Sequence, residues 1–237
     1  MKVTLLQSSP EPIKAIYLAC RTCYSQKPPT ELEQNDEAKM MTLIRRTLAS
    51  GHHSVLEHAT FSFSIEGVSR ALTHQLVRHR IASYAQQSQR YVDFSKTDAP
   101  AITIPPKIKG ANLEKFEAVI TEIYSLYKEL VADGIEPEDA RYILPNAAHT
   151  NIIVTMNYRE LINFSKLRLC FKSQWEIQHM TREMRKAVST VQKELAEFLE
   201  PKCQHLGYCD EKDPCGHYVF STESEVVRRK VREKWLQ

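Results

Sequence analysis

The chain has 237 residues, of which 42% are hydrophobic and 26% are charged, a composition typical of a soluble globular protein with a sizeable core. Its net charge of +3 is too small to indicate bulk nucleic-acid binding. Its six glycines lie too far apart for a glycine-rich dinucleotide or phosphate loop, so other groups must hold any bound phosphate. The chain has no apolar run of about 18 residues, and six cysteines do not make a disulfide scaffold, so we expect a cytoplasmic protein.

Hydrophobic periodicity predicts one α+β domain over residues 1–200, followed by a C-terminal tail at 201–237. Strands are expected at 1–6, 60–65 and 151–156. Helices are expected at 13–24, 35–48, 68–77, 113–132, 137–144, 159–169 and 174–199. Residues 81–97 are polar and irregular.

The densest polar cluster begins at the end of the helix expected at 68–77. Arg78, His79 and Arg80 are consecutive, and successive helical residues point about 100° apart, so their side chains cannot share one partner. Three groups that can carry positive charge, aimed in three directions, indicate an anion-rich site. The alternative is a solvated helix end, where the helix dipole also favours cations.

The segment that follows is also suited to a nucleotide. If residues 84–91 are extended, Tyr84, Gln86, Ser88 and Arg90 lie on one face, because strand side chains alternate. The amide of Gln86 suits the edge of a base, while the hydroxyl of Ser88 and the guanidinium of Arg90 suit a phosphate. An exposed polar loop is the alternative.

Arg78-His79-Arg80, seven further residues and then Ser88 form an R-H-R-x7-S signature, and in this the chain resembles the flavin-dependent thymidylate synthases. The similarity extends over roughly residues 13–200. It includes a G-H-x-[ST]-x-x-E-H segment at 51–58 and an A-R-x-x-L-P segment at 140–145. It also includes a C-terminal block, which comprises 157–168 and 174–177.

The resemblance implies an α+β fold with a central, largely antiparallel sheet flanked by helices. It implies reductive methylation of deoxyuridine monophosphate (dUMP) to thymidine monophosphate (dTMP). In that reaction methylenetetrahydrofolate gives the carbon, FAD carries the hydride and NADPH is the reductant. The resemblance also implies a homotetramer in which several chains build each active site.

Site residues follow from the same resemblance, position by position. Arg168 is expected to be the catalytic arginine, placed against the pyrimidine to favour ionisation at its N3. The dUMP contacts would be Arg168 together with Gln75, Leu76, Val77, Arg78, Gln86, Gln87, Ser88, Gln89, Arg90 and Arg141. The FAD contacts would be Ser54, Arg78, His79, Arg80, Gln86, Asn157, Tyr158, Arg159 and Asn163.

Two positions near the signature need separate interpretation. Ser88 has no obvious base beside it in the sequence, so we interpret it as a nucleotide ligand. A nucleophile activated by His52 or His79 is the alternative. Many relatives carry a polar residue where this chain has Ala85, and several carry Glu where it has Gln86, which keeps hydrogen-bonding capacity but loses the charge.

Metal and redox chemistry are weaker interpretations of two other clusters. His52, Glu57 and His58 lack the H-E-x-x-H spacing of a metal-binding helix, so no metal is expected, and contact with the flavin or with residues that contact it is preferred. Cys20 and Cys23 have redox spacing but lie in a helical pattern, so ordinary packing is preferred.

The tail at 201–237 contains a cluster of soft metal ligands and a basic segment. The cluster consists of Cys203, His205, Cys209, Cys215 and His217. Its spacing fits no standard zinc module, so a metal clip is an alternative there. Residues 225–235 are interpreted as a solvated, basic, helix-like segment, with RNA or DNA contact as the alternative. Two rival functions stay open: a nucleic-acid-binding module that uses the arginines, and a metal-dependent hydrolase that uses the histidines of 52–58.

Overall fold

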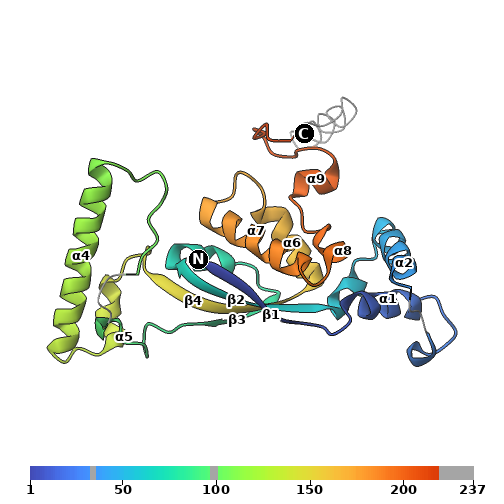
Figure 1. Cartoon of the computed structure of the whole chain (residues 1–237), viewed down its shortest axis with the longest axis horizontal. Coiled ribbons are helices and arrows are strands. Elements are labelled where there is room, and N and C mark those ends of the chain that lie inside the picture. Colours follow the sequence, from blue (N-terminus) through green and yellow to red (C-terminus); the bar gives the residue numbers. More distant parts are fainter. Residues whose placement is uncertain (33–35, 97–100, 219–237) are drawn as a thin grey trace, which may run out of the picture. The chain divides into compact units, whose positions relative to one another are not determined.

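The computed structural model describes residues 1–32, 36–96 and 101–218 (Figure 1). The basic segment at 225–235 therefore lies outside the described residues. The chain divides into two compact units, which are described separately. The first unit comprises Met1–Lys2, Ser64–Arg78 and Tyr84–Val154, and the second comprises Val3–Phe63, His79–Ser83 and Thr155–Gln237. The division into a domain at 1–200 and a tail at 201–237 stays a prediction.

Four strands form one sheet in the order β1-β2-β4-β3. They are β1 (Lys2–Ser8), β2 (Thr60–Ser69), β3 (Ala82–Gln86) and β4 (His149–Asn157). On β2 and β4, the hydroxyls of Ser62 and Thr155 lie 2.8 Å apart, and Gly67 N donates to Asn151 Oδ1 at 3.0 Å. Since residue numbers rise along one strand as they fall along the other, this pair is antiparallel. The predicted α+β class with a largely antiparallel sheet is confirmed.

Helices supply most of the remaining regular structure. The α-helices are α1 (Pro12–Thr22), α2 (Glu37–Ala49), α3 (Arg70–Leu76), α4 (Ala111–Ala132), α5 (Pro137–Ala140), α6 (Tyr158–Arg168), α7 (Trp175–Ser189), α8 (Lys193–Ala196) and α9 (Lys202–Leu206). Short 3-10 helices occur at η1 (Pro29–Glu31), η2 (Ser54–His58), η3 (Phe94–Lys96) and η4 (Arg141–Ile143). Within the described residues, no helix combines the length and apolar character needed to cross a membrane.

Several helices begin where a side chain caps their first turn. The Oδ1 atom of Asn157 accepts from the backbone N–H of Glu160 at 2.9 Å, which fixes the start of α6 directly after β4. Ser69 caps α3 in the same way, through its hydroxyl and Leu72 N. Both helices that lead to the R-H-R cluster or to Arg168 are therefore held at their first turn.

The prediction of a single helix over 174–199 is wrong. The structure has α7 and then α8, separated by residues 190–192. The hydroxyls of Ser189 and Thr190 donate to the carbonyls of Lys186 and Ala187, each three residues earlier, and so compete with helical hydrogen bonding. Gln192 is not helical, with φ −147° and ψ 83°. The helix therefore ends although the apolar spacing continues.

Two further boundaries differ from the prediction. The helix expected at 68–77 begins only at Arg70, because β2 continues through Ser69. The irregular segment expected at 81–97 contains β3 and η3. β3 pairs with β4 at one end of the sheet order, so backbone pairing rather than an apolar pattern defines it.

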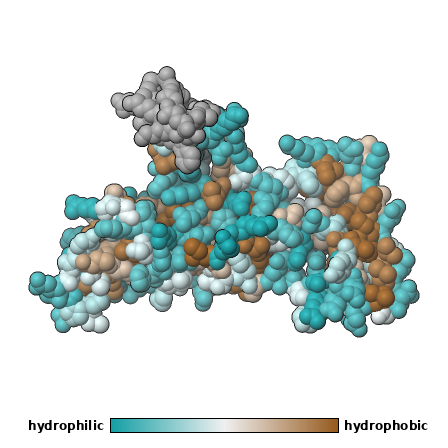
Figure 2. Space-filling model, turned by 180° about the vertical axis from the view of Figure 1, so that it is seen from behind, coloured by the Kyte–Doolittle hydropathy of each residue, from teal (hydrophilic) through white to brown (hydrophobic). Residues whose placement is uncertain are grey.

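Each unit has its own buried core. In the second unit α1 and α2 pack together, as do α6 and α7, around side chains such as Ile16, Ile44 and Phe164 (Figure 1). In the first unit α4 contacts α5 and buries Tyr124 and Tyr127. The outer surface of α4 is apolar in places, as the brown area at its position in Figure 2 shows.

Candidate functional site

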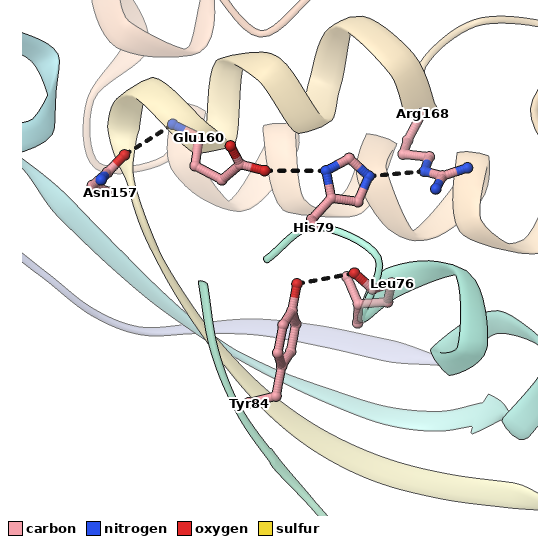
Figure 3. A network of polar contacts seen from close by, with 6 residues as sticks. All are labelled: Leu76, His79, Tyr84, Asn157, Glu160 and Arg168. Atoms are coloured by element: carbon pink, nitrogen blue, oxygen red, sulfur yellow. Dashed lines mark hydrogen bonds and ion pairs between the residues drawn. The ribbon is translucent and has the colours of Figure 1, made fainter. Parts of the chain in front are cut away.

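A buried histidine connects an acid and an arginine in the second unit. His79 Nδ1 lies 3.1 Å from Glu160 Oε1, and Arg168 Nε donates to His79 Nε2 at 3.1 Å (Figure 3). The side chains of His79 and Glu160 are only 7% and 8% exposed. The middle residue of the R-H-R signature is thus held in place by two residues of α6.

The donor groups define the protonation state of this histidine. An arginine Nε can only donate, so His79 Nε2 must accept, and the ring proton lies on Nδ1 and is donated to Glu160. Burial lowers the pKa of His79, and the positive charge of Arg168 lowers it further, while Glu160 acts in the opposite direction. At neutral pH the imidazole is therefore an uncharged bridge between a carboxylate and a guanidinium.

Helical spacing explains why α6 can supply both partners. Glu160, Phe164 and Arg168 are four residues apart and lie along one side of the helix. The His79 ring meets the Phe164 ring edge-on, with 4.7 Å between centroids. His79 is therefore oriented by a ring contact as well as by two hydrogen bonds.

The neighbouring side of α6 is exposed and polar. Arg159 and Asn163 are four residues apart and both are exposed, so they share a face that a ligand can reach. Arg159 Nη1 pairs with Glu57 Oε1 at 2.6 Å, which connects this face to η2, where Ser54 is also exposed. Burial lowers the pKa of His53, and the charges of Lys166 and Arg159 add to that effect. The surroundings are thus rich in positive charge and hydrogen-bond donors.

The first unit contains most of the predicted nucleotide contacts. Gln75 to Arg78 lie at the end of α3, where Leu76 is buried and its carbonyl accepts from Tyr84 Oη at 2.9 Å (Figure 3). Gln86 Nε2 donates to the hydroxyls of Thr73 and Thr150 at 3.1 and 3.3 Å.

Two glutamines of the same segment border a cavity in the first unit. Gln87 and Gln89 line a space of about 240 Å³ together with Asn151, whose Nδ2 donates to Gln87 Oε1 at 3.2 Å. This places two of the predicted nucleotide contacts beside a hollow with amide donors and acceptors.

The extended conformation expected over 84–91 ends at Gln86. Beyond it the chain turns, and Arg90 N donates to Ser88 Oγ at 3.1 Å. The predicted common face of Tyr84, Gln86, Ser88 and Arg90 is therefore wrong past residue 86. A hydroxyl that bonds its own backbone two residues on favours a turn over a strand.

Glu138 instead brings two predicted dUMP contacts together. Its carboxylate pairs with the Arg90 guanidinium, and its backbone carbonyl accepts from Arg141 Nε at 3.0 Å. Arg70, which the sequence did not single out, belongs to the same group, because burial lowers its pKa and the charge of Arg141 lowers it further. Three arginines thus gather in the first unit.

Comparison with known proteins places this arrangement in a family. The family model described as thymidylate synthase complementing protein matches residues 4–192. A flavin-dependent thymidylate synthase of Geobacter sulfurreducens is 46% identical over 231 residues, covering 96% of this chain and 97% of that protein. Another, from Pyrococcus abyssi, is 40% identical over 246 residues and covers 100% and 97%. The chain belongs to the flavin-dependent thymidylate synthases.

A solved structure from this family has the same fold. It is the flavin-dependent thymidylate synthase ThyX of Helicobacter pylori complexed with FAD and dUMP, at a TM-score of 0.68 and 26% identity. The match covers 84% of this chain and 100% of that one. The resemblance inferred from the R-H-R-x7-S signature is confirmed.

Two of the residues expected to contact FAD have structural roles. Asn157 caps α6, and Tyr158 is fully buried, with its hydroxyl donating to Leu195 O at 2.6 Å. A flavin contact at Tyr158 would have to use its backbone. Burial raises the pKa of this phenol, so it stays a neutral donor.

Removing that hydroxyl should therefore affect folding rather than cofactor binding. Tyr158→Phe leaves the Leu195 carbonyl without its donor, and we expect the free energy of unfolding to fall by about 1–2 kcal/mol. Denaturant titration measures this change, and flavin absorbance of the purified variant should match wild type. A flavin-free variant that is as stable as wild type would contradict the structural role.

The metal and redox alternatives gain no geometric support. Within the described residues, no three His, Cys, Asp or Glu side chains are arranged to hold a metal ion, and all six cysteines are free thiols. The hydroxyl of Tyr24 lies 3.0 Å from His52 Nδ1, and Cys20 is buried, which raises the pKa of its thiol. His52 and His53 thus directly precede η2, and His58 is its last residue.

Proposed function

We propose that this chain catalyses FAD-dependent reductive methylation of dUMP to dTMP in the cytoplasm. Methylenetetrahydrofolate is the proposed carbon donor and NADPH the proposed reductant. One observation carries the proposal: the buried, uncharged His79 fixes Arg168 through its Nε. Six free thiols agree with a reducing compartment.

Arg168 is the proposed catalytic residue. Methylation at C5 of uracil requires negative charge to develop in the pyrimidine ring. A guanidinium carries five N–H donors and stays charged, so it stabilises that charge without losing a proton. The bond from Nε to His79 orients the guanidinium, and the terminal nitrogens are the donors assigned to the pyrimidine. No cysteine nucleophile is required for this chemistry.

The second unit offers groups that fit FAD. A flavin nucleotide carries a diphosphate and a polar ring edge, and Arg159, Asn163 and Ser54 are exposed donors of the matching kinds. Arg80 is exposed as well, and it lies next to the buried His79. When bound, FAD supplies the hydride for the reduction. The protein's contribution is to orient it with side chains in place of glycine-rich backbone.

The arginines of the first unit are the proposed ligands of the nucleotide phosphate. Arg90 and Arg141 both contact Glu138, and their forked donors suit a phosphate. Arg70 adds a third positive charge next to Arg141. Gln87 and Gln89, which line the 240 Å³ cavity, are the proposed neutral contacts.

A homotetramer with shared active sites is the proposed assembly. Its support is the apolar outer surface of α4 (Figure 2), where Val119 and Leu126 are 52% and 47% exposed. Exposed apolar surface of this kind favours protein contact. The proposed tetramer gives four chain masses in sedimentation equilibrium, and a monomeric mass at micromolar concentration would contradict the assembly.

The decisive test of the function is anaerobic turnover with dUMP, methylenetetrahydrofolate and NADPH, with thymidylate as the product measured. Omission of each component is the control. The purified protein should also be yellow from bound flavin. A colourless protein with steeply salt-dependent oligonucleotide binding would favour the nucleic-acid module, and chelator-sensitive hydrolysis would favour the hydrolase.

Ser88→Ala separates a ligand from a nucleophile at that position. Ser88 Oγ accepts from Arg90 N, and its O–H is the proposed donor to the nucleotide phosphate. We expect loss of that charge-assisted hydrogen bond to weaken dUMP binding by about 10-fold, with kcat largely kept. The measurement is thymidylate formation across a range of dUMP concentrations. Complete loss of turnover at saturating dUMP would support the nucleophile instead.

A further inference from the structure

A second cavity, lined by positively charged side chains, lies in the second unit, and none of the site residues assigned above to dUMP or FAD lines it. Its volume is about 510 Å³, and α7 and α8 line it with Arg182, Arg185, Lys186 and Lys193. This size is typical of small-molecule sites, which occupy roughly 300–1,000 Å³. We call it the basic cavity.

The carboxylates near the basic cavity do not neutralise it. Glu197, which also lines it, pairs with Arg45 at 3.0 Å, and Lys186 Nζ lies 3.9 Å from Glu183. Across residues 1–32, 36–96 and 101–218, no ion pair involves Arg182, Arg185 or Lys193. Like charges that line one cavity repel each other, and a bound anion offsets that repulsion.

Glu200 interacts with Arg185 at longer range. Burial raises the pKa of the Glu200 carboxyl, and the charges of Arg185 and Lys166 offset that rise only in part. Glu200 pairs with neither arginine of the basic cavity. The net charge of the cavity lining is therefore positive.

One of the four cations is held in position by aromatic rings. The Arg182 guanidinium lies 5.4 Å from the centroid of the Phe171 ring, a cation–π distance. Phe171 in turn stacks on His217 with 3.8 Å between centroids and meets the Tyr218 ring edge-on at 5.9 Å. Tyr218 also lines the basic cavity. A guanidinium fixed in this way loses less freedom when it binds an anion.

We propose that the basic cavity binds a small molecule that carries two or more phosphate groups. Arginine forks match phosphate oxygens bidentately, and two lysines supply further charge for a second phosphate. A cavity of about 510 Å³ suits a compact ligand better than an extended nucleic acid. Such a ligand is either a pyridine nucleotide or a free nucleoside di- or triphosphate.

Inorganic pyrophosphate is the probe for the shared chemistry. Titration calorimetry at physiological ionic strength compares wild type with the double variant Arg182→Gln, Arg185→Gln. We expect binding to weaken by at least about tenfold, because two charge-assisted contacts are lost. The matched control is Lys109→Gln, Lys115→Gln, which removes the same charge from exposed sites near and on α4 and should change the affinity less than about twofold.

Two further measurements distinguish between the two candidate ligands. A rise in the KM for NADPH in the arginine variant, with the KM for dUMP unchanged, identifies a pyridine nucleotide. Loss of ATP affinity with the KM for NADPH unchanged identifies a free nucleotide. No binding of pyrophosphate by wild type, or equal weakening in the control, overturns the proposal. The pyrophosphate and ATP arms do not depend on thymidylate formation, so they decide the proposal even if the proposed function fails.

Discussion

Replacement of Arg168 by alanine is expected to abolish methylation of dUMP while leaving FAD bound. The variant loses the guanidinium that is held by His79 and assigned to the developing charge of the pyrimidine. Loss of one such preorganised group costs about 10²–10³-fold in kcat. The proposed flavin contacts Arg159 and Asn163 are untouched, so flavin absorbance should persist. Thymidylate formation at saturating dUMP measures the loss.

Two further variants define what Arg168 contributes. Arg168→Lys keeps a positive charge but lacks the Nε–H that donates to His79, so its turnover should fall between wild type and alanine. Arg46→Ala removes an exposed arginine from α2 and should behave as wild type. Turnover close to wild type in Arg168→Ala would remove this residue from the proposed mechanism.

The sequence predicted those elements whose boundaries are encoded locally. β4 follows from the β-branched run at 151–156, and α6 follows from the helical spacing after it, which predicts a start one residue later than the observed Tyr158. β3 was missed because its residues, Ala-Ser-Tyr-Ala-Gln, lack an apolar pattern, and pairing with β4 is a long-range contact. The break between α7 and α8 was missed because hydroxyl bonds to the backbone override continuing apolar spacing.

The sequence proposes residues for the candidate site but does not indicate the contacts between them. The R-H-R signature identified His79, yet nothing local indicates that it is buried or that Glu160, 81 residues away, accepts its proton. A glutamate in a helix is ordinarily exposed, so Glu160 carried no signal. Arg70 was missed for the same reason, since its proximity to Arg141 exists only in the folded first unit.

Glu160 is expected to position Arg168 through His79, and Glu160→Gln tests this role. An amide oxygen can still accept the His79 proton, but the hydrogen bond loses its charge assistance. We expect the free energy of unfolding at pH 7 to fall by about 1–2 kcal/mol. We also expect a lower kcat at an unchanged KM for dUMP, because the variant loosens a guanidinium without removing it. Glu11→Gln, at an exposed ion pair with Lys14, is the control and should change stability by less than about 1 kcal/mol.

The pH dependence distinguishes this role from simple packing. The folded pKa of His79 lies below its ordinary value of about 6.5, so on acidification the unfolded chain takes up the proton first. The contribution of neutral His79 to the free energy of unfolding is fully present above the unfolded pKa. It is lost progressively as the pH drops from the unfolded pKa toward the folded pKa. Glu160 raises the pKa of His79, so Glu160→Gln must lower the folded pKa of His79 further. The loss of stability on acidification then continues to a lower pH in the variant than in wild type. Urea midpoints between pH 7 and 4 should therefore diverge between variant and wild type. Parallel curves with an unchanged kcat would show that Glu160 only fills space beside His79.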